Sequence, residues 1–181
     1  GSGMVVVAGA LAGLQYVAVA GLAGYLLALG WWGRVLVAPL RRRPPREFAP
    51  ASVLAAMIWW LVALVVTGGI VLTTPTSGWS EVTGTLAVVW AGGFAAQLLT
   101  GALSYLLPSV LGGGPRVVRA GAAWFDRFTT FRIVALNGAL ILFLTPTPPW
   151  VKLTSGVLGV GSVAAFLPLM ILGIKASVAE R

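Results

Sequence analysis

The 181-residue chain contains no cysteine and no histidine, and only 9% of its residues are charged. The absence of cysteine excludes disulfides, thiolate metal sites and cysteine nucleophiles. The absence of histidine removes the commonest metal and haem ligand and the usual general base. Most redox and hydrolytic mechanisms are therefore excluded within this chain alone. The sequence predicts no catalytic residue, no metal ligand and no bound cofactor.

The residues that are present are mostly apolar. Hydrophobic residues make up 59% of the chain and its mean hydropathy is +0.98, which leaves too little polar surface to coat a water-soluble globule. The net charge is +8, but the basic residues lie beside apolar runs, which favours anionic lipid headgroups over nucleic acid as their partner. Ten of the twelve basic residues are Arg, and this composition indicates a bacterial plasma-membrane protein.

Five apolar runs follow one another, each near the length of about 20 residues that crosses a hydrocarbon core as a helix. The fourth run is short, so its helix is expected to begin near Phe128, with Arg132 snorkelling to the headgroups. Pro108 is expected to end the third helix, and Pro168 to kink the fifth. The runs cover residues 4–29, 51–72, 82–107, 133–145 and 151–174.

Residues 115–130 differ in kind from these runs. A face of basic and small or polar residues recurs there at spacings of three and four, and bulky apolar residues fall largely on the opposite side of a helix. The members of that face are Arg116, Arg119, Ala123, Arg127 and Thr130. This pattern is typical of an amphipathic helix that lies at the headgroup level. We expect Trp124, Phe125 and Phe128 to dip toward the acyl chains. The residues expected to bind lipid headgroups are Arg116, Arg119, Arg127 and Arg132.

The distribution of basic residues predicts the orientation. Eleven of the twelve fall in the connectors after the first and third runs and in the C-terminal tail, and Lys152 alone falls on the other side. Because cytoplasmic connectors collect Lys and Arg, the N-terminus is expected outside and the C-terminus in the cytoplasm.

These patterns together predict an all-α fold, a polytopic transmembrane helix bundle of about five spanning helices and one cytoplasmic interfacial helix. Residues 4–181 are expected to form a single transmembrane helical domain. Gly1, Ser2 and Gly3 resemble an expression-vector scar or a truncated start. An outside start without charges of its own leaves two alternatives, unaided translocation of a short tail or upstream helices in a longer protein.

Few polar side chains lie within the runs, and no Asp, Glu, Lys, Arg or His lies at mid-membrane depth, which argues against a proton relay or an ion-coupled transporter. Buried amides in lipid need hydrogen-bond partners, and neighbouring helices provide them. Interhelical contacts are therefore the favoured role, over a ligand site, for Gln15, Gln97, Asn137 and Ser104.

The stretch 95–140 carries a family resemblance. It reads AAQLLTGALSYLLPSVLGGGPRVVRAGAAWFDRFTTFRIVALNGAL and resembles the later helices of the membrane-spanning region of actinobacterial copper oxidase and copper nitrite reductase-associated proteins. The likeness is most specific over 103–119, and Asp126, Arg127 and Asn137 continue it. Family members are His-rich in their earlier helices, where haem or copper would be ligated. This chain has no histidine, so no metal site can be carried over to it.

Two functions remain. The resemblance implies a non-catalytic membrane module that anchors, scaffolds or helps to assemble a copper-dependent or respiratory complex, with lipids, other membrane subunits or copies of itself as partners. The alternative is a small transporter or channel whose pore is lined by Gln15, Gln97, Ser104 and Asn137. An integral-membrane enzyme ranks third, because the chain offers no base or nucleophile in a plausible site.

The predicted orientation can be tested with single cysteines, since the native chain has none. A Ser77→Cys variant is expected to react with a membrane-impermeant thiol reagent added outside the cell, because its connector faces outward. An Arg43→Cys variant is expected to react only after the membrane is permeabilised. The reverse pattern would contradict the orientation.

Overall fold

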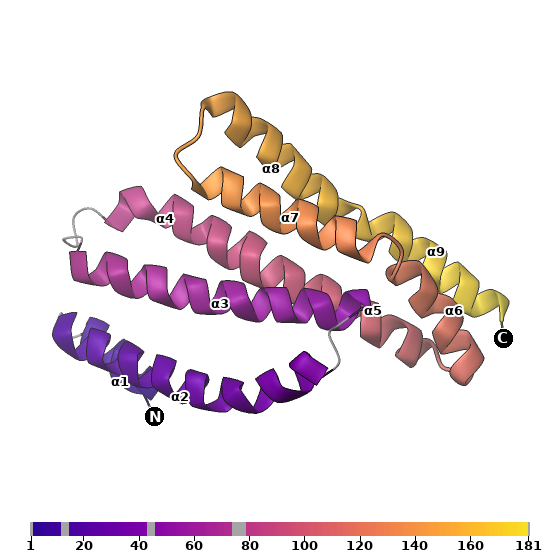
Figure 1. Ribbon diagram of the computed structural model, residues 1–181, viewed down its shortest axis with the longest axis horizontal. Helices are drawn as coiled ribbons and strands as arrows, with labels where there is room; N and C mark the ends of the chain where they lie inside the picture. The colour runs from indigo at the N-terminus through magenta and orange to yellow at the C-terminus, as the bar shows by residue number, and fades with distance from the viewer. Residues whose placement is uncertain (1, 12–14, 43–45, 74–78, 181) are drawn as a thin grey trace. The chain divides into compact units, whose positions relative to one another are not determined.

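The computed structural model describes residues 2–11, 15–42, 46–73 and 79–180, and in this part of the chain every regular element is a helix. The connectors that hold Arg43 and Ser77 lie outside the described residues. The helices are α1 (Ser2–Leu11), α2 (Gln15–Arg42), α3 (Phe48–Thr73), α4 (Trp79–Val88), a π-helix (Val89–Ala95), α5 (Ala96–Leu111), α6 (Pro115–Phe125), α7 (Thr129–Leu144), α8 (Pro149–Ala164) and α9 (Phe166–Ala179) (Figure 1).

Three of the described helical segments are long and apolar enough to cross a membrane. They are Phe48–Thr73, Val82–Leu111 and Pro149–Ala179, and they contain the predicted second, third and fifth runs. Helices α6 and α7 would add a fourth span if together they form one, although they are bent by 43°. The described part of the chain is therefore all-helical, with three or four segments long and apolar enough to cross a membrane, and the predicted count of five is not confirmed.

The first apolar run is not one helix. It is divided between α1 and α2, which pack against each other. A Cβ atom added at Gly21 of α2 would lie 2.8 Å from the backbone nitrogen of Val6, so the glycine permits close approach of the two helices. The ten residues of α1 extend only about 15 Å, half of a hydrocarbon core.

The chain divides into two compact units. The first unit comprises Gly1–Pro44 and Trp60–Ala87. Within it, the rings of Tyr25 on α2 and Trp60 on α3 meet edge to face with centroids 5.9 Å apart. Leu22 packs against Gly68, where a Cβ atom would lie 2.6 Å from the leucine methyl group.

The second unit comprises Pro45–Trp59 and Val88–Arg181, and its aromatic core joins helices that are distant in sequence. Phe125 of α6 and Phe166 of α9 have ring centroids 5.7 Å apart. Helices α7 and α8 lie side by side, and α6 packs along α9 (Figure 1). The buried rings are Phe48, Phe125 and Phe166, and the side chains packed on them are Leu103, Leu107, Ile133 and Met170.

Pro108 and Pro168 have different effects on their helices. Helix α5 continues past the buried Pro108 to Leu111, so the third helix does not end where predicted. Membrane helices tolerate proline because neighbouring groups satisfy the freed carbonyl. The helix over the predicted fifth run is divided at Ala165 into α8 and α9. Pro168 has no N–H, so the carbonyl of Ala164, four residues earlier, loses its usual hydrogen-bond donor.

The turn between α5 and α6 depends on glycine. Gly112, Gly113 and Gly114 have φ values of 69°, 97° and 86°, a region that other residues rarely adopt. Pro115 then occupies the first turn of α6, where its missing N–H costs nothing.

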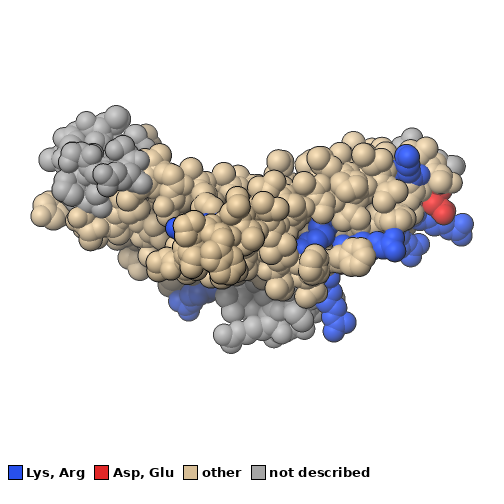
Figure 2. Space-filling view, turned by 90° about the horizontal axis from the view of Figure 1, so that it is seen from above, with Lys and Arg blue, Asp and Glu red and all other residues tan. Residues whose placement is uncertain are grey.

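The surface also fits a lipid environment. On the face shown in Figure 2, most of the described surface carries neither basic nor acidic side chains. Large apolar side chains such as Leu99, Val134 and Val160 are exposed. Exposed apolar area on this scale is stable when lipid rather than water covers it.

Candidate functional site

The best-defined polar site in the second unit is a reciprocal pair of amides. Gln97 on α5 donates from Nε2 to Asn137 Oδ1 at 3.2 Å, and Asn137 on α7 donates from Nδ2 to Gln97 Oε1 at 3.1 Å. The Gln97 residue is only 1% exposed. Each amide thus satisfies the other, which is the condition for burying such groups.

A tryptophan from a third helix completes this arrangement. Trp59 on α3 donates from its indole Nε1 to Asn137 Oδ1 at 2.6 Å. The remaining amide hydrogens are used within their own helices, because Gln97 Nε2 also donates to Gly93 O at 2.9 Å and Asn137 Nδ2 to Ile133 O at 2.7 Å. Hydrogen bonds therefore join α3, α5 and α7.

The π-helix makes room for the indole. A Cβ atom added at Gly93 would lie 2.8 Å from the ring of Trp59, so only glycine allows this contact without a shift. The wider turn of a π-helix is commonly found where a helix is shaped around a functional or packing requirement.

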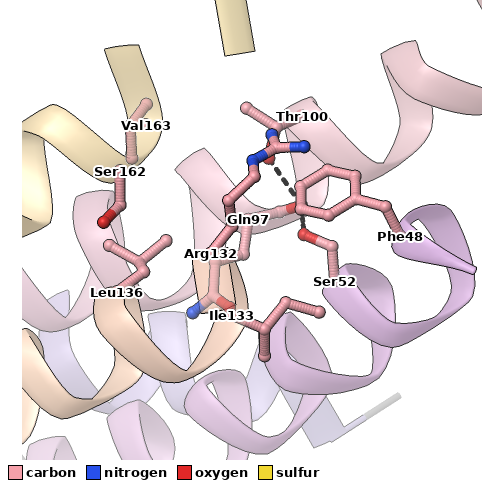
Figure 3. A pocket seen from close by; sticks show the side chains of 9 residues that line it. All are labelled: Phe48, Ser52, Gln97, Thr100, Arg132, Ile133, Leu136, Ser162 and Val163. Carbon is pink, nitrogen blue, oxygen red and sulfur yellow. Dashed lines mark hydrogen bonds between the residues drawn. The ribbon is translucent and has the colours of Figure 1, made fainter. Parts of the chain in front are cut away.

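A second hydrogen bond joins α3 to α5 near the amide pair. Ser52 Oγ donates to the backbone carbonyl of Gln97 at 2.8 Å, and Thr100 Oγ1 donates to the same oxygen at 3.3 Å. Figure 3 shows these side chains converging on Gln97. We call the set Ser52, Trp59, Gln97 and Asn137 the amide junction.

Arg132 lies beside the amide junction and is buried. Its guanidinium carbon stands 3.7 Å from the centroid of the Phe48 ring (Figure 3). Its Nη1 donates to Phe125 O at 3.1 Å. The residue is 5% exposed. This differs from the predicted snorkelling to the headgroups, because an aromatic face and a carbonyl replace water around the cation.

A small cavity adjoins the guanidinium. Its volume is about 10 Å³, near the room that one water molecule needs. Arg132 Nε is buried without a protein partner in the described structure. The cavity is lined by Phe48, Ser52, Gln97, Thr100, Arg132, Ile133, Leu136, Ser162 and Val163.

Asp126 fixes the start of α3. Its Oδ1 accepts a hydrogen bond from the backbone N–H of Phe48 at 2.7 Å. This bond satisfies one of the N–H groups that a helix start leaves without a partner. The same contact holds the Phe48 ring in place for Arg132.

Helix α6 separates a basic side from an apolar side, as predicted, but its apolar side packs inward. Val117, Gly121 and Phe125 are buried, and Gly173 of α9 lies against the Phe125 ring, which a Cβ atom there would approach to 2.9 Å. Phe125 therefore contacts the bundle rather than the acyl chains. Trp124 is half-buried, whereas the exposed side carries Arg116, Arg119, Arg127 and Phe128.

The remaining predicted site residues lie apart from the amide junction. Ser104 is buried, and its hydroxyl donates to Gly101 O of its own helix at 2.7 Å, which is a contact within α5. Gln15 is the first residue of α2, and its side chain lies outside the part of the structure that is described.

Sequence analysis missed two members of the junction, Ser52 and Trp59. Together with Ala56 and Ala63 they form a buried face of α3 at spacings of four, three and four. A polar or small face of this kind within an apolar run is the signal that would have indicated them.

The junction is suited to hydrogen bonding rather than to proton transfer, since amides, an indole and a hydroxyl do not titrate near neutral pH. Among the described residues there is no group of three or more His, Cys, Asp or Glu side chains placed to hold a metal. Comparison with known protein families, with curated proteins and with solved structures finds no match.

A double-mutant cycle on the amide pair tests its coupling. Gln97→Met and Asn137→Leu are each expected to destabilise the protein by about 1 to 3 kcal/mol, because each removes the hydrogen-bond partner of the other amide. The double variant is expected to lose about 1 kcal/mol less than the sum. The measurement is equilibrium unfolding in detergent, followed by circular dichroism.

Ser104→Ala is the matched control and is expected to change the unfolding free energy little, because its hydroxyl bonds only within its own helix. Strict additivity of the two amide substitutions would contradict the coupling.

Proposed function

We propose that this chain is a non-catalytic integral membrane module that anchors, scaffolds or helps to assemble a larger membrane complex. It is proposed to reside in a bacterial plasma membrane with its N-terminus outside and its C-terminus in the cytoplasm. Five spans would require the α1–α2 region and the α6–α7 pair each to cross the membrane.

The observation that supports this proposal is that polar side chains of the second unit are hydrogen-bonded to one another between helices. The amides of Gln97 and Asn137 and the indole of Trp59 are hydrogen-bonded to one another across three helices. Polar groups that are hydrogen-bonded to one another in this way hold a bundle together and leave little hydrogen-bonding capacity for a solute.

The alternative is a small transporter or channel lined by Gln15, Gln97, Ser104 and Asn137. A conducting pore needs polar groups that face an aqueous path. The cavity beside Gln97 has a volume of only about 10 Å³, and Ser104 bonds within its own helix. These contacts favour the module over the pore.

The kind of complex is inferred from the resemblance of residues 95–140. That resemblance points to a copper-dependent or respiratory assembly whose metal ligands belong to other subunits, because this chain has neither histidine nor cysteine. Exposed apolar side chains on the helices would then contact lipid or neighbouring membrane subunits.

We further propose that α6 binds anionic headgroups at the cytoplasmic surface. Arg116, Arg119 and Arg127 are exposed on one side of the α6 region, and the guanidinium of Arg127 lies 4.8 Å from the ring centroid of Trp124. Basic residues paired with an interfacial aromatic suit an anionic membrane surface.

Copurification from native membrane tests the module against the transporter. The tagged full chain, extracted in a mild detergent, is expected to bring other membrane proteins at fixed stoichiometry by native mass spectrometry. The matched control is the Asn137→Leu variant, which is expected to retain fewer partners if the fold of the bundle presents the binding face. A solitary oligomer that supports solute flux in liposomes would contradict the proposal.

A further inference from the structure

An open groove runs along α8 on the outside of the second unit. Its volume is about 740 Å³, and Phe143 of α7 forms one wall. The other lining residues follow two adjacent rows of α8, namely Lys152, Leu153, Gly156, Val157, Val160 and Gly161. From Lys152 to Gly161 the helix rises about 14 Å.

Two glycines create the hollow. A Cβ atom at Gly161 would meet no atom within 4 Å, and one at Gly156 would meet only the Phe143 ring, at 3.9 Å. Neither glycine is needed for close packing inside the chain. Larger side chains would therefore fit at both positions and would occupy the groove.

Among the described residues, Lys152 is the one basic residue that lines the groove. Lys152 lies in the first turn of α8 and is exposed, and Trp150 two residues earlier is 69% exposed. An exposed tryptophan beside a lysine at the start of an apolar helix is typical of the headgroup level of a membrane. The rest of the groove is apolar.

We propose that this groove binds an anionic phospholipid, with the phosphate at the Lys152 ammonium group and one acyl chain along Gly156 to Gly161. The length of the groove supports this occupant, because about 14 Å is close to half of the 30 Å hydrocarbon core and so to the depth of one leaflet. This lipid site is separate from α6 and does not depend on the complex that the module serves.

The charge favours a lipid over another helix. An apolar helix from a partner or from a second copy would cover Lys152 without supplying a counter-charge, which is costly in lipid. A phospholipid brings its phosphate to the same depth as its acyl chain. The α8–α9 span is also the least covered, with 11% of its most apolar window buried against 22% and 28% in the other two spans.

The test is lipid retention by the full chain, measured by native mass spectrometry after release from nanodiscs of equal phosphatidylglycerol and phosphatidylcholine. The wild type is expected to retain phosphatidylglycerol preferentially. Lys152→Gln is expected to reduce that preference about fivefold. The Gly156→Leu/Gly161→Leu variant is expected to lose the lipid whatever its headgroup, because leucine fills the groove.

Gly138→Leu on α7 is the control, since a Cβ atom there also meets nothing within 4 Å and Gly138 does not line the groove. It is expected to retain lipid as the wild type does. A variant with Arg116, Arg119 and Arg127 changed to Gln distinguishes lipid bound at α6 from lipid bound in the groove. Its loss of retained phosphatidylglycerol is expected to add to the loss caused by Lys152→Gln. Undiminished retention by the double leucine variant, or an oligomer that this variant alone dissociates, would overturn the lipid assignment.

Discussion

The hydrogen bonds among Trp59, Gln97 and Asn137 are the constraint on which the second unit depends. In lipid, an amide without a partner is expensive, so each of these groups fixes the positions of the other two. The bonds are 2.6 to 3.2 Å long and join α3, α5 and α7. Polar pairing therefore helps to fix the register between these helices.

The placement of Arg132 follows from that register. Once α3 is fixed against α7, Phe48 at the start of α3 lies under the guanidinium, and Asp126 holds the backbone N–H of Phe48 at 2.7 Å. An arginine buried in this way needs both the aromatic face and the Phe125 carbonyl. The α6–α7 corner thereby belongs to the bundle, although it also carries exposed arginines.

Sequence patterns predicted the long apolar segments well. The expected runs 51–72, 82–107 and 151–174 lie within Phe48–Thr73, Val82–Leu111 and Pro149–Ala179, and α7 begins at Thr129, beside the predicted start. Hydropathy could not separate α1 from α2, because a continuous apolar run looks the same as two short packed helices. Hydropathy also could not predict where the Arg132 side chain lies. Whether it reaches the headgroups or stacks on an aromatic ring depends on the position of Phe48 in the folded structure.

The most direct test of this account is the exchange of the Trp59 indole N–H with deuterium, observed by NMR in nanodiscs and assigned with a Trp59→Phe variant. A proton donated to Asn137 in a dry, packed junction is expected to persist for hours after transfer to D₂O. Loss of the signal at the rate of the exposed indoles, such as those of Trp31 and Trp150, would mean that water reaches Gln97 and Asn137. That result would contradict the structural role of the junction and favour a pore.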